Sequence, residues 1–235
     1  MATGLRRLVP WQNDYPTSDG RPMAETDWHR SLMTALIETL QGWYAKNQRI
    51  YVSGNLLIFY EAGNKRRHVA PDVFVVKGVK KHPRPNFLVW EEGKAPDVVI
   101  ELTSKTTRTE DQKKKYHLYQ DVLEVKEYYL FDPFGDYLKP PMKGYRLIRG
   151  KYHPIPTLQA RLPSQILDLH LERDGKDLRL YDLTSWQWLP TPAEALASAR
   201  GAQLEADNAR LRAEGENQQL RREVEELRRR LEHHS

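Results

Sequence analysis

Hydrophobic residues follow two different spacings in the first part of this chain. Between residues 26 and 46 they recur every three or four positions, which predicts an amphipathic helix. From residue 49 to residue 62 the chain is rich in Ile, Tyr, Val and Phe, which predicts a strand with a break at Gly54-Asn55. The pattern therefore predicts a helix followed by a strand.

Two further apolar runs each carry an acidic residue. The run from His68 to Val76 contains Asp72, and the run Val98-Val99-Ile100 ends in Glu101. Short runs rich in β-branched residues predict buried strands. A buried carboxylate is costly unless it is paired or binds a metal ion. The pattern thus predicts two acids on neighbouring strands, and surface ion pairs are the alternative explanation for either acid alone.

A second helix is predicted after Glu101. Thr107 as N-cap and Glu110 three residues later have the spacing of a capping box. An apolar stripe then follows at positions i, i+3 and i+7, made of Tyr116, Tyr119 and Leu123. Lys115 lies four residues before Tyr119, at the margin of this stripe. The helix can therefore bring a lysine towards the carboxylate at the strand end.

The segments that follow complete the predicted organisation. Residues 127–131 predict a strand, so the order up to this point is helix, three strands, helix, strand. Short alternating segments with many prolines predict a β-rich extension packed on this core from 137 to 189. We therefore expect an irregular lead-in over 1–24, an α/β domain with its extension over 25–190, and a C-terminal helix over 191–235.

The C-terminal segment shows the spacing of a coiled coil. Residues at alternating intervals of three and four occupy the a and d positions of a heptad: Asn217, Leu220, Val224, Leu227 and Leu231. Glu216 with Arg221, and Glu223 with Arg228, then occupy g and e′ positions, where opposite charges attract across a parallel pair of helices. The pattern predicts a homodimer through this helix. A single solvated helix is the alternative, since Gly215 and a change of register leave few good heptads.

Composition narrows the classes of protein to which the chain can belong. Its 235 residues, with 39% apolar content, suffice for one sizeable core. The absence of cysteine excludes a disulfide scaffold and thiolate metal sites, and it suits a cytoplasmic protein. No apolar run has the length of a membrane span. The net charge of +5 is compatible with a nucleic-acid partner.

The two acids and the lysine form a combination with a defined chemistry. Carboxylates such as those of Asp72 and Glu101 are hard oxygen ligands that hold Mg²⁺ or Mn²⁺. A lysine beside them, here Lys115, positions or activates the attacking water. Taken together and in this order, these residues favour a metal-dependent hydrolase over separate surface ion pairs.

Basic residues occur in two segments that could contact phosphates. One is a turn that leads into the Asp72 strand, and the other is a long loop over residues 77–94 that also contains Phe87 and Trp90. The basic candidates for nucleic-acid binding are Lys65, Arg66, Arg67, Lys80, Lys81 and Arg84. The alternative for the turn is that its basic residues are simply solvated. The alternative for the loop is that Trp90 packs in the core.

The chain resembles the Uma-type endonucleases, a family of the PD-(D/E)XK, restriction-endonuclease-like superfamily. The residues that carry the resemblance are, in order, Asp72, Glu101, Lys115, Tyr119, Glu127-Tyr128-Tyr129 and Asp132-Pro133. The resemblance covers residues 15–190 and implies an αβββαβ core, a mixed sheet flanked by helices. It further implies that Asp72 and Glu101 bind the metal ion, and that Lys115 and Tyr119 complete the catalytic site.

The sequence departs from the family pattern at one position, and it offers further residues that could support the catalytic site. The lysine expected two residues after Glu101 is Thr103 here, so the lysine is expected from the following helix. That points to Lys115, with Lys105 among the alternatives. Members of the family commonly carry a histidine in the first helix. His29 is the supporting residue expected on this basis. Glu25 precedes the helix and is a further supporting candidate, as a third acidic group near the metal ion.

We therefore expect a Mg²⁺- or Mn²⁺-dependent endonuclease acting on DNA. One alternative is a nucleic-acid-binding protein that has kept the fold and lost cleavage, which Thr103 in place of lysine would explain. Another is an assembly or adaptor protein in which the coiled coil is the working part.

Overall fold

The computed structural model describes residues 14–18, 26–103 and 110–232, and only the backbone path of residues 110–112 and 231. Contacts divide the chain into two compact units, Met1–Leu189 and Pro190–Ser235. The fold is mixed α/β with several sheets and a long C-terminal helix. This agrees with the predicted fold class.

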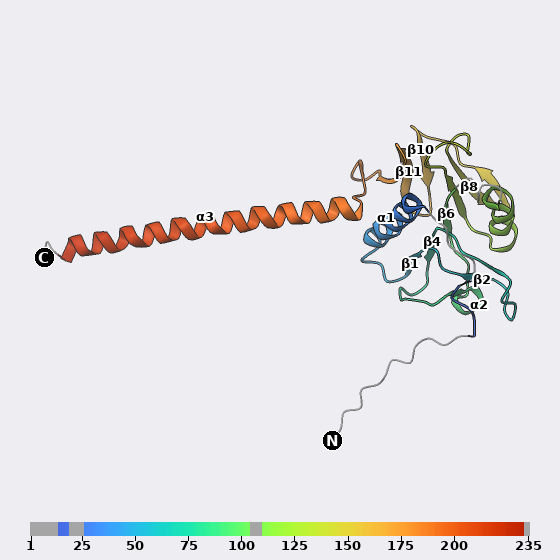
Figure 1. Ribbon diagram of the computed structural model, residues 1–235, viewed down its shortest axis with the longest axis horizontal. Coiled ribbons are helices and arrows are strands. Elements are labelled where there is room, and N and C mark those ends of the chain that lie inside the picture. Colours follow the sequence, from blue (N-terminus) through green and yellow to red (C-terminus); the bar gives the residue numbers. More distant parts are fainter. Residues whose placement is uncertain (1–13, 19–25, 104–109, 233–235) are drawn as a thin grey trace, which may run out of the picture. The chain divides into compact units, whose positions relative to one another are not determined.

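The first unit is built on a six-stranded sheet with the strand order β1-β4-β6-β7-β8-β9 (Figure 1). The strands are β1 (Ile50–Ser53), β4 (Val73–Lys77), β6 (Val98–Leu102), β7 (Glu127–Phe131), β8 (Met142–Ile148) and β9 (Lys151–Pro154). β6 and β7 are parallel, and every other neighbouring pair is antiparallel. The parallel pair is joined by a helical crossover, as parallel strands require.

Helices cover both faces of this sheet. Helix α1 (Asp27–Trp43), capped by the Thr26 side chain, packs its leucines on the face that carries Val73 and Ile100. The opposite face is covered by the helical segments η1 (Glu110–Lys115) and η2 (Leu118–Val122). Figure 1 shows α1 and this second helical region on opposite sides of the sheet. Side chains on successive strand residues alternate between these two cores.

The helix predicted over 107–123 differs from expectation in its hydrogen bonding. Both η1 and η2 are π-helical, and the Leu123 N–H donates to the Leu118 carbonyl five residues earlier at 3.0 Å. A π-turn contains one more residue than an α-turn and is often found at functional sites. The predicted capping box of Thr107 and Glu110 lies outside the residues whose side chains are described.

The predicted β-rich extension consists of two strands added to the main sheet, β8 and β9, and a second sheet. That sheet contains β10 (Arg161–Ser164), β11 (Leu169–Asp174), β12 (Asp177–Asp182) and β13 (Gln187–Trp188), all antiparallel. Its leucines, including Leu169 and Leu180, belong to the same core as α1. The extension therefore packs onto the α/β core through α1.

Three segments are divided differently from the prediction. The segments 49–62, 68–76 and 77–94 each contribute one strand to a small sheet, which contains β2 (Ile58–Phe59), β3 (His68–Val69) and β5 (Phe87–Leu88). The short helix α2 (Val89–Glu92) follows β5. The predicted single strand over 68–76 is thus two strands in two sheets, because Pro71 cannot donate to a ladder and its carbonyl accepts from Asn55 N at 2.8 Å. The predicted loop over 77–94 contains β5 and α2.

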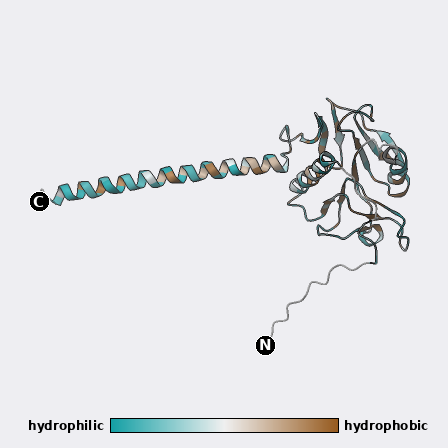
Figure 2. Ribbon diagram, viewed as in Figure 1, coloured by the Kyte–Doolittle hydropathy of each residue, from teal (hydrophilic) through white to brown (hydrophobic). Residues whose placement is uncertain are grey.

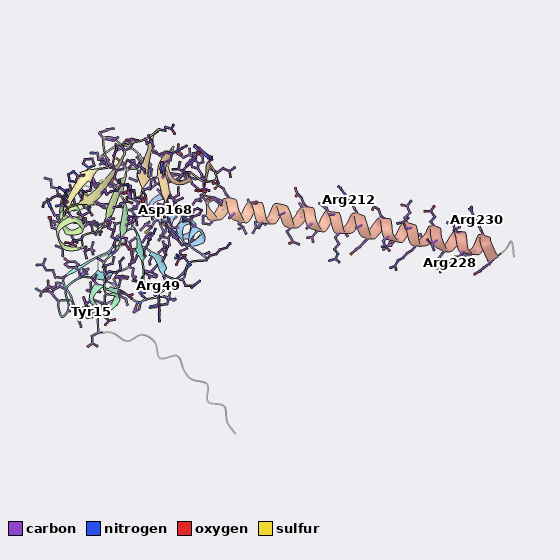
Figure 3. All side chains as sticks on the ribbon, turned by 180° about the vertical axis from the view of Figure 1, so that it is seen from behind. Tyr15, Arg49, Asp168, Arg212, Arg228 and Arg230 are labelled. Carbon is purple, nitrogen blue, oxygen red and sulfur yellow. The ribbon has the colours of Figure 1, made fainter. Side chains whose placement is uncertain are left out.

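The second unit contains the helix α3 (Pro192–Glu232). Thr191 and Glu194 form a reciprocal capping box at its start, with N–H to side-chain distances of 2.8 and 3.3 Å. Figure 2 shows a mostly hydrophilic helix with interspersed hydrophobic residues, and Figure 3 shows Arg212, Arg228 and Arg230 projecting from it. Among the described helices, none is both long and apolar enough to cross a membrane.

A buried carboxylate joins the strands of the main sheet at the end opposite the two acids. Asp97 directly precedes β6, is 2% exposed, and accepts a hydrogen bond from Lys77 N on β4 at 2.7 Å. The ammonium groups of Lys94 and Lys126 lie 2.8 and 2.7 Å from its oxygens. Burial raises the pKa of Asp97, but the bonds from Lys126 and Lys94 outweigh burial and hold this pKa below its ordinary value.

We expect Asp97→Asn to lower the free energy of unfolding at pH 7. A depressed pKa contributes stability above the pKa of the unfolded chain, about 3.9 for aspartate, and this contribution is lost as the pH falls through the folded-state pKa. The difference in free energy of unfolding between the wild type and Asp97→Asn should stay constant from pH 7 to about pH 5 and shrink below about pH 4. Urea unfolding at a series of pH values measures it, with Asp207→Asn on the exposed face of α3 as control. A difference that grows on acidification contradicts the assignment.

Candidate active site

The two acids predicted to act together lie side by side at one end of the main sheet. β4 and β6 are antiparallel, with Val73 opposite Ile100. The residue before Val73, Asp72, therefore lies opposite the residue after Ile100, Glu101. The backbone N–H of Asp72 lies 3.4 Å from Glu101 Oε2. The register of one strand pair thus brings the two carboxylates together.

Glu101 is buried, and its carboxylate is held by two side chains from the π-helical segments. Its side chain is 1% exposed. The Lys115 ammonium donates to Oε2 at 2.9 Å, and the Tyr119 hydroxyl donates to Oε1 at 2.7 Å. These bonds compensate for the cost of burying the charge. They also hold the carboxylate in one orientation.

Asp72 lies just before β4 and is held from two directions. His29 Nε2, in the first turn of α1, lies 3.1 Å from Oδ1, and the Leu102 N–H donates to Oδ2 at 2.7 Å. Burial raises the pKa of the Asp72 carboxyl, but the bond with His29 and the charge of Lys115 hold this pKa below its ordinary value. Asp72 is therefore a carboxylate at neutral pH.

Gly54 allows β1 to approach this site closely. A Cβ at Gly54 would lie 1.9 Å from the Asp72 carbonyl oxygen and 2.7 Å from Ile37 Cδ1. Only glycine fits where two backbones approach this closely. The break predicted at Gly54-Asn55 is thus the point at which the chain passes against the Asp72 backbone.

Thr103, which replaces the expected lysine, is buried at the end of β6. Its N–H donates to the Phe131 carbonyl at 2.7 Å. Among the described residues, its hydroxyl oxygen has no hydrogen-bond partner. The two remaining supporting candidates, Glu25 and Lys105, lie outside the described residues.

The basic candidates for nucleic-acid binding differ in exposure. Lys65, Arg66, Arg67 and Lys80 are exposed, and Arg67 pairs with Glu61 at 3.4 Å. Lys81 is partly buried. These residues are compatible with a phosphate-facing surface.

Arg84 requires a correction. Its side chain is 3% exposed, its guanidinium lies 4.1 Å from the centre of the Tyr51 ring, and its Nε pairs with Glu92 at 2.5 Å. A buried guanidinium that is stacked and paired in this way stabilises the loop and does not face a ligand. The charge pattern gave no signal of this burial, because Tyr51 lies on a separate strand, β1.

Other buried acids have structural partners. Glu127 pairs with Arg146 at 2.9 Å and accepts from Ser164, and Asp132 accepts the N–H groups of four residues in the following turn. The Leu102 N–H that holds Asp72 was not predicted, since a backbone group leaves no mark in a residue pattern.

The donor set at Asp72 and Glu101 fits a hard divalent cation. Among the described residues, no group of three or more His, Cys, Asp or Glu side chains is placed to hold a metal ion. Mg²⁺, however, usually binds one or two carboxylates, keeps several waters and takes substrate phosphate oxygens as further ligands. Each carboxylate oxygen has two lone pairs, and the bonds from His29 and Leu102 engage different oxygens of Asp72, so each of these oxygens can accept a further ligand. Two adjacent carboxylates therefore suffice for this ion.

The chain is similar to a known protein family and to solved structures. A family model described as "Uma2: Putative restriction endonuclease" matches residues 10–174. A crystal structure described as that of "a putative nuclease belonging to DUF820" from Anabaena variabilis ATCC 29413 has a TM-score of 0.47 and 17% sequence identity. The match covers 64% of this chain and 80% of that chain. No curated protein matches the chain.

We expect Tyr119→Phe to destabilise the protein more than Tyr152→Phe does. Both hydroxyls are buried, but Tyr119 donates to the Glu101 carboxylate and Tyr152 donates to the neutral Val125 carbonyl at 2.9 Å. Hydrogen bonds to charged groups contribute about 1.5–3 kcal/mol, against about 0.5–1.5 kcal/mol for neutral pairs. Urea unfolding at pH 7 measures both losses, and equal losses would show that Glu101 does not depend on this hydroxyl.

Proposed function

The chain belongs to the Uma2 family, and from this premise we propose that it is a metal-dependent endonuclease that hydrolyses phosphodiester bonds of DNA. One observation carries the proposal: Asp72 and Glu101 meet at adjacent strand ends, with the Lys115 ammonium 2.9 Å from the Glu101 carboxylate. Two carboxylates and a lysine in contact are the groups that metal-assisted hydrolysis requires.

The order of elements supports a restriction-endonuclease-like core. Helix α1, strands β1, β4 and β6, the π-helical segments, and β7 follow one another along the chain, and all four strands are neighbours in one sheet. This is the αβββαβ order, with a mixed sheet flanked by helices. β2, β3, β5 and α2 are insertions into that order.

In this proposal Asp72 and Glu101 bind Mg²⁺ or Mn²⁺. When bound, the ion supplies Lewis-acid polarisation of a phosphoryl oxygen and lowers the pKa of a coordinated water. His29 and the Leu102 N–H fix the direction of the Asp72 carboxylate. Tyr119 does the same for Glu101. Preorganised oxygens of this kind avoid reorganisation during the reaction.

Lys115 positions the attacking water in the proposed reaction. Its side chain is 16% exposed, and its ammonium group lies 2.9 Å from the buried carboxylate. A lysine in this place donates hydrogen bonds to water and offsets negative charge that develops on the phosphate. Because this lysine comes from η1, Thr103 does not deprive the site of an ammonium group, which favours an active enzyme over an inactive binding protein.

Lys115→Ala is expected to reduce cleavage by about a hundred- to ten-thousandfold, the usual contribution of a group that handles the proton or orients water. The matched controls are Lys113→Ala and Lys114→Ala, since both side chains are exposed on the same π-helical segment. Nicking of supercoiled plasmid measures the rate. Loss of activity in Lys105→Ala with a silent Lys115→Ala would give the role to Lys105.

Cleavage should require Mg²⁺ or Mn²⁺. Ca²⁺ should support DNA binding without cleavage, because two carboxylates favour hard cations but Ca²⁺ binds with more ligands and longer distances. The plasmid assay after exhaustive chelation, followed by addition of each metal in turn, tests this. Cleavage that persists after chelation would rule out the metal-dependent mechanism.

We also propose that α3 pairs with α3 of a second copy. Leu220, Val224 and Leu227 are 61%, 47% and 53% exposed, and they lie at d, a and d positions. The flanking pairs Glu216–Arg221 and Glu223–Arg228 carry opposite charges in g and e′ positions. Because each site cuts one strand, a dimer would supply the two sites that breaking a duplex requires.

Leu227→Lys should shift the protein from dimer to monomer, since it places like charges in the apolar seam. Gln218→Lys adds the same charge at a b position outside the seam and should leave the dimer intact. Sedimentation velocity of the full chain at several concentrations distinguishes the two. If Leu227→Lys sediments as the wild type does, α3 is not the interface.

A further inference from the structure

Two exposed aromatic rings and a lysine come together from three separate elements. Trp28 in α1 is 41% exposed, and Phe134 in the turn after β7 is 50% exposed. The Lys176 ammonium, in the turn between β11 and β12, lies 5.8 Å from the Trp28 ring centre and 4.8 Å from the Phe134 ring centre. We call these three residues the aromatic patch.

The aromatic patch adjoins the end of the sheet that carries the two acids. Trp28 immediately precedes His29, whose ring lies 3.1 Å from Asp72. Phe131, the last residue of β7, pairs with Leu102, the residue after Glu101. The turn that carries Phe134 therefore begins at the same end of the sheet as the carboxylates. The aromatic patch and the carboxylates therefore share one end of the sheet.

The turn that presents Phe134 is held in place. The buried Asp132 carboxylate accepts the N–H groups of Phe134 and Gly135 at 3.2 and 3.0 Å, and those of Tyr137 and Leu138 at 2.6 and 2.9 Å. Arg173 on β11 donates to the Pro133 carbonyl at 3.3 Å. A segment with a fixed backbone loses little conformational entropy when a ligand binds to it. The turn thus holds the backbone that carries the exposed Phe134 side chain in place.

We propose that the aromatic patch binds an unpaired nucleotide of the DNA strand held at the carboxylates. The base stacks on the exposed rings of Phe134 and Trp28, and the adjoining phosphate pairs with Lys176. Aromatic rings next to a cation are the combination that binds single-stranded nucleic acid without sequence preference, since every base has a flat face. Bases inside a duplex offer no free face, so the substrate is DNA with a single-stranded segment next to the cut. This inference rests on the proposed nuclease function for the position of the cut.

Binding to three fluorescein-labelled DNAs tests the proposal. The full-length protein is titrated in Ca²⁺ with a single strand, a blunt duplex and a duplex with a single-stranded extension, and anisotropy is measured. The wild type should prefer the single strand and the extended duplex. Phe134→Ala and Trp28→Ala should each weaken binding of these two DNAs by about five- to a hundredfold, as removal of one stacking ring does. Binding of the blunt duplex should change less than twofold.

Matched variants separate stacking from other effects. Trp43 lies at the other end of α1 and is 39% exposed, close to the 41% of Trp28, so Trp43→Ala should leave all three affinities unchanged. Phe134→Trp should retain the preference, whereas Phe134→Leu, which is apolar without a π face, should lose it. Lys176→Glu should weaken binding without altering either ring.

The outcomes distinguish this inference from the nuclease function. A single-strand preference that depends on Phe134 and Trp28 in a protein without cleavage supports the aromatic patch and rejects the nuclease. Cleavage by a protein whose Phe134→Ala and Trp28→Ala variants bind single strands normally rejects the aromatic patch alone. A wild type without single-strand preference, or equal weakening of all three DNAs in both variants, also overturns it.

Discussion

The burial of the Glu101 carboxylate is the constraint on which the rest of the site depends. A charge at 1% exposure requires partners, and those partners, Lys115 and Tyr119, lie on the π-helical segments that cover one face of the sheet. The same contacts hold the crossover between β6 and β7 against the strand end. Because β4 is antiparallel to β6, Asp72 then follows as the neighbour of Glu101. The register of the sheet and the partners of Glu101 therefore determine the geometry of the site together.

The acids of the α/β core divide into two groups by the nature of their partners. Asp97 and Glu127 are surrounded by lysine or arginine side chains and backbone N–H groups, which ties strands and turns together. Asp72 and Glu101 instead lie beside each other at the ends of two neighbouring strands, and the Lys115 ammonium pairs with Glu101. Neighbouring carboxylates repel, so this pair gains from a cation that the structural acids do not require. This difference supports the proposed metal site at Asp72 and Glu101.

Substrate recognition and assembly would lie on different parts of the chain. The aromatic patch joins α1, the turn after β7 and the β11–β12 hairpin, so the β-rich extension contributes to the surface beside the site. The exposed apolar stripe of α3 belongs to the second compact unit and carries no aromatic residue. A strand could thus be held by stacking next to the carboxylates while α3 determines how many sites are present. Substrate recognition and assembly can then each be altered by mutation without a change in the other.

Local patterns in the sequence were sufficient to predict the main elements and the family. The three-to-four spacing of α1, the β-branched runs of β4 and β6, and the heptads of α3 are properties of neighbouring residues, so they can be seen without a structure. The resemblance to the Uma-type family, which these elements and the two acids carried, is confirmed by the match over residues 10–174. The acids and Lys115 could be named because residue type restricts metal and proton chemistry to few side chains.

Only the tertiary structure decided how distant residues combine. It divided the predicted strand at Pro71 between two sheets and buried Arg84 against Tyr51. It also brought the Lys115 ammonium to the Glu101 carboxylate, in place of the lysine that Thr103 replaces. It also brought together the three residues of the aromatic patch. Each of these results depends on strand register and packing between segments many residues apart. Spacing within one segment contains no information about such contacts, whereas the balance of burial and pairing over the whole fold determines them.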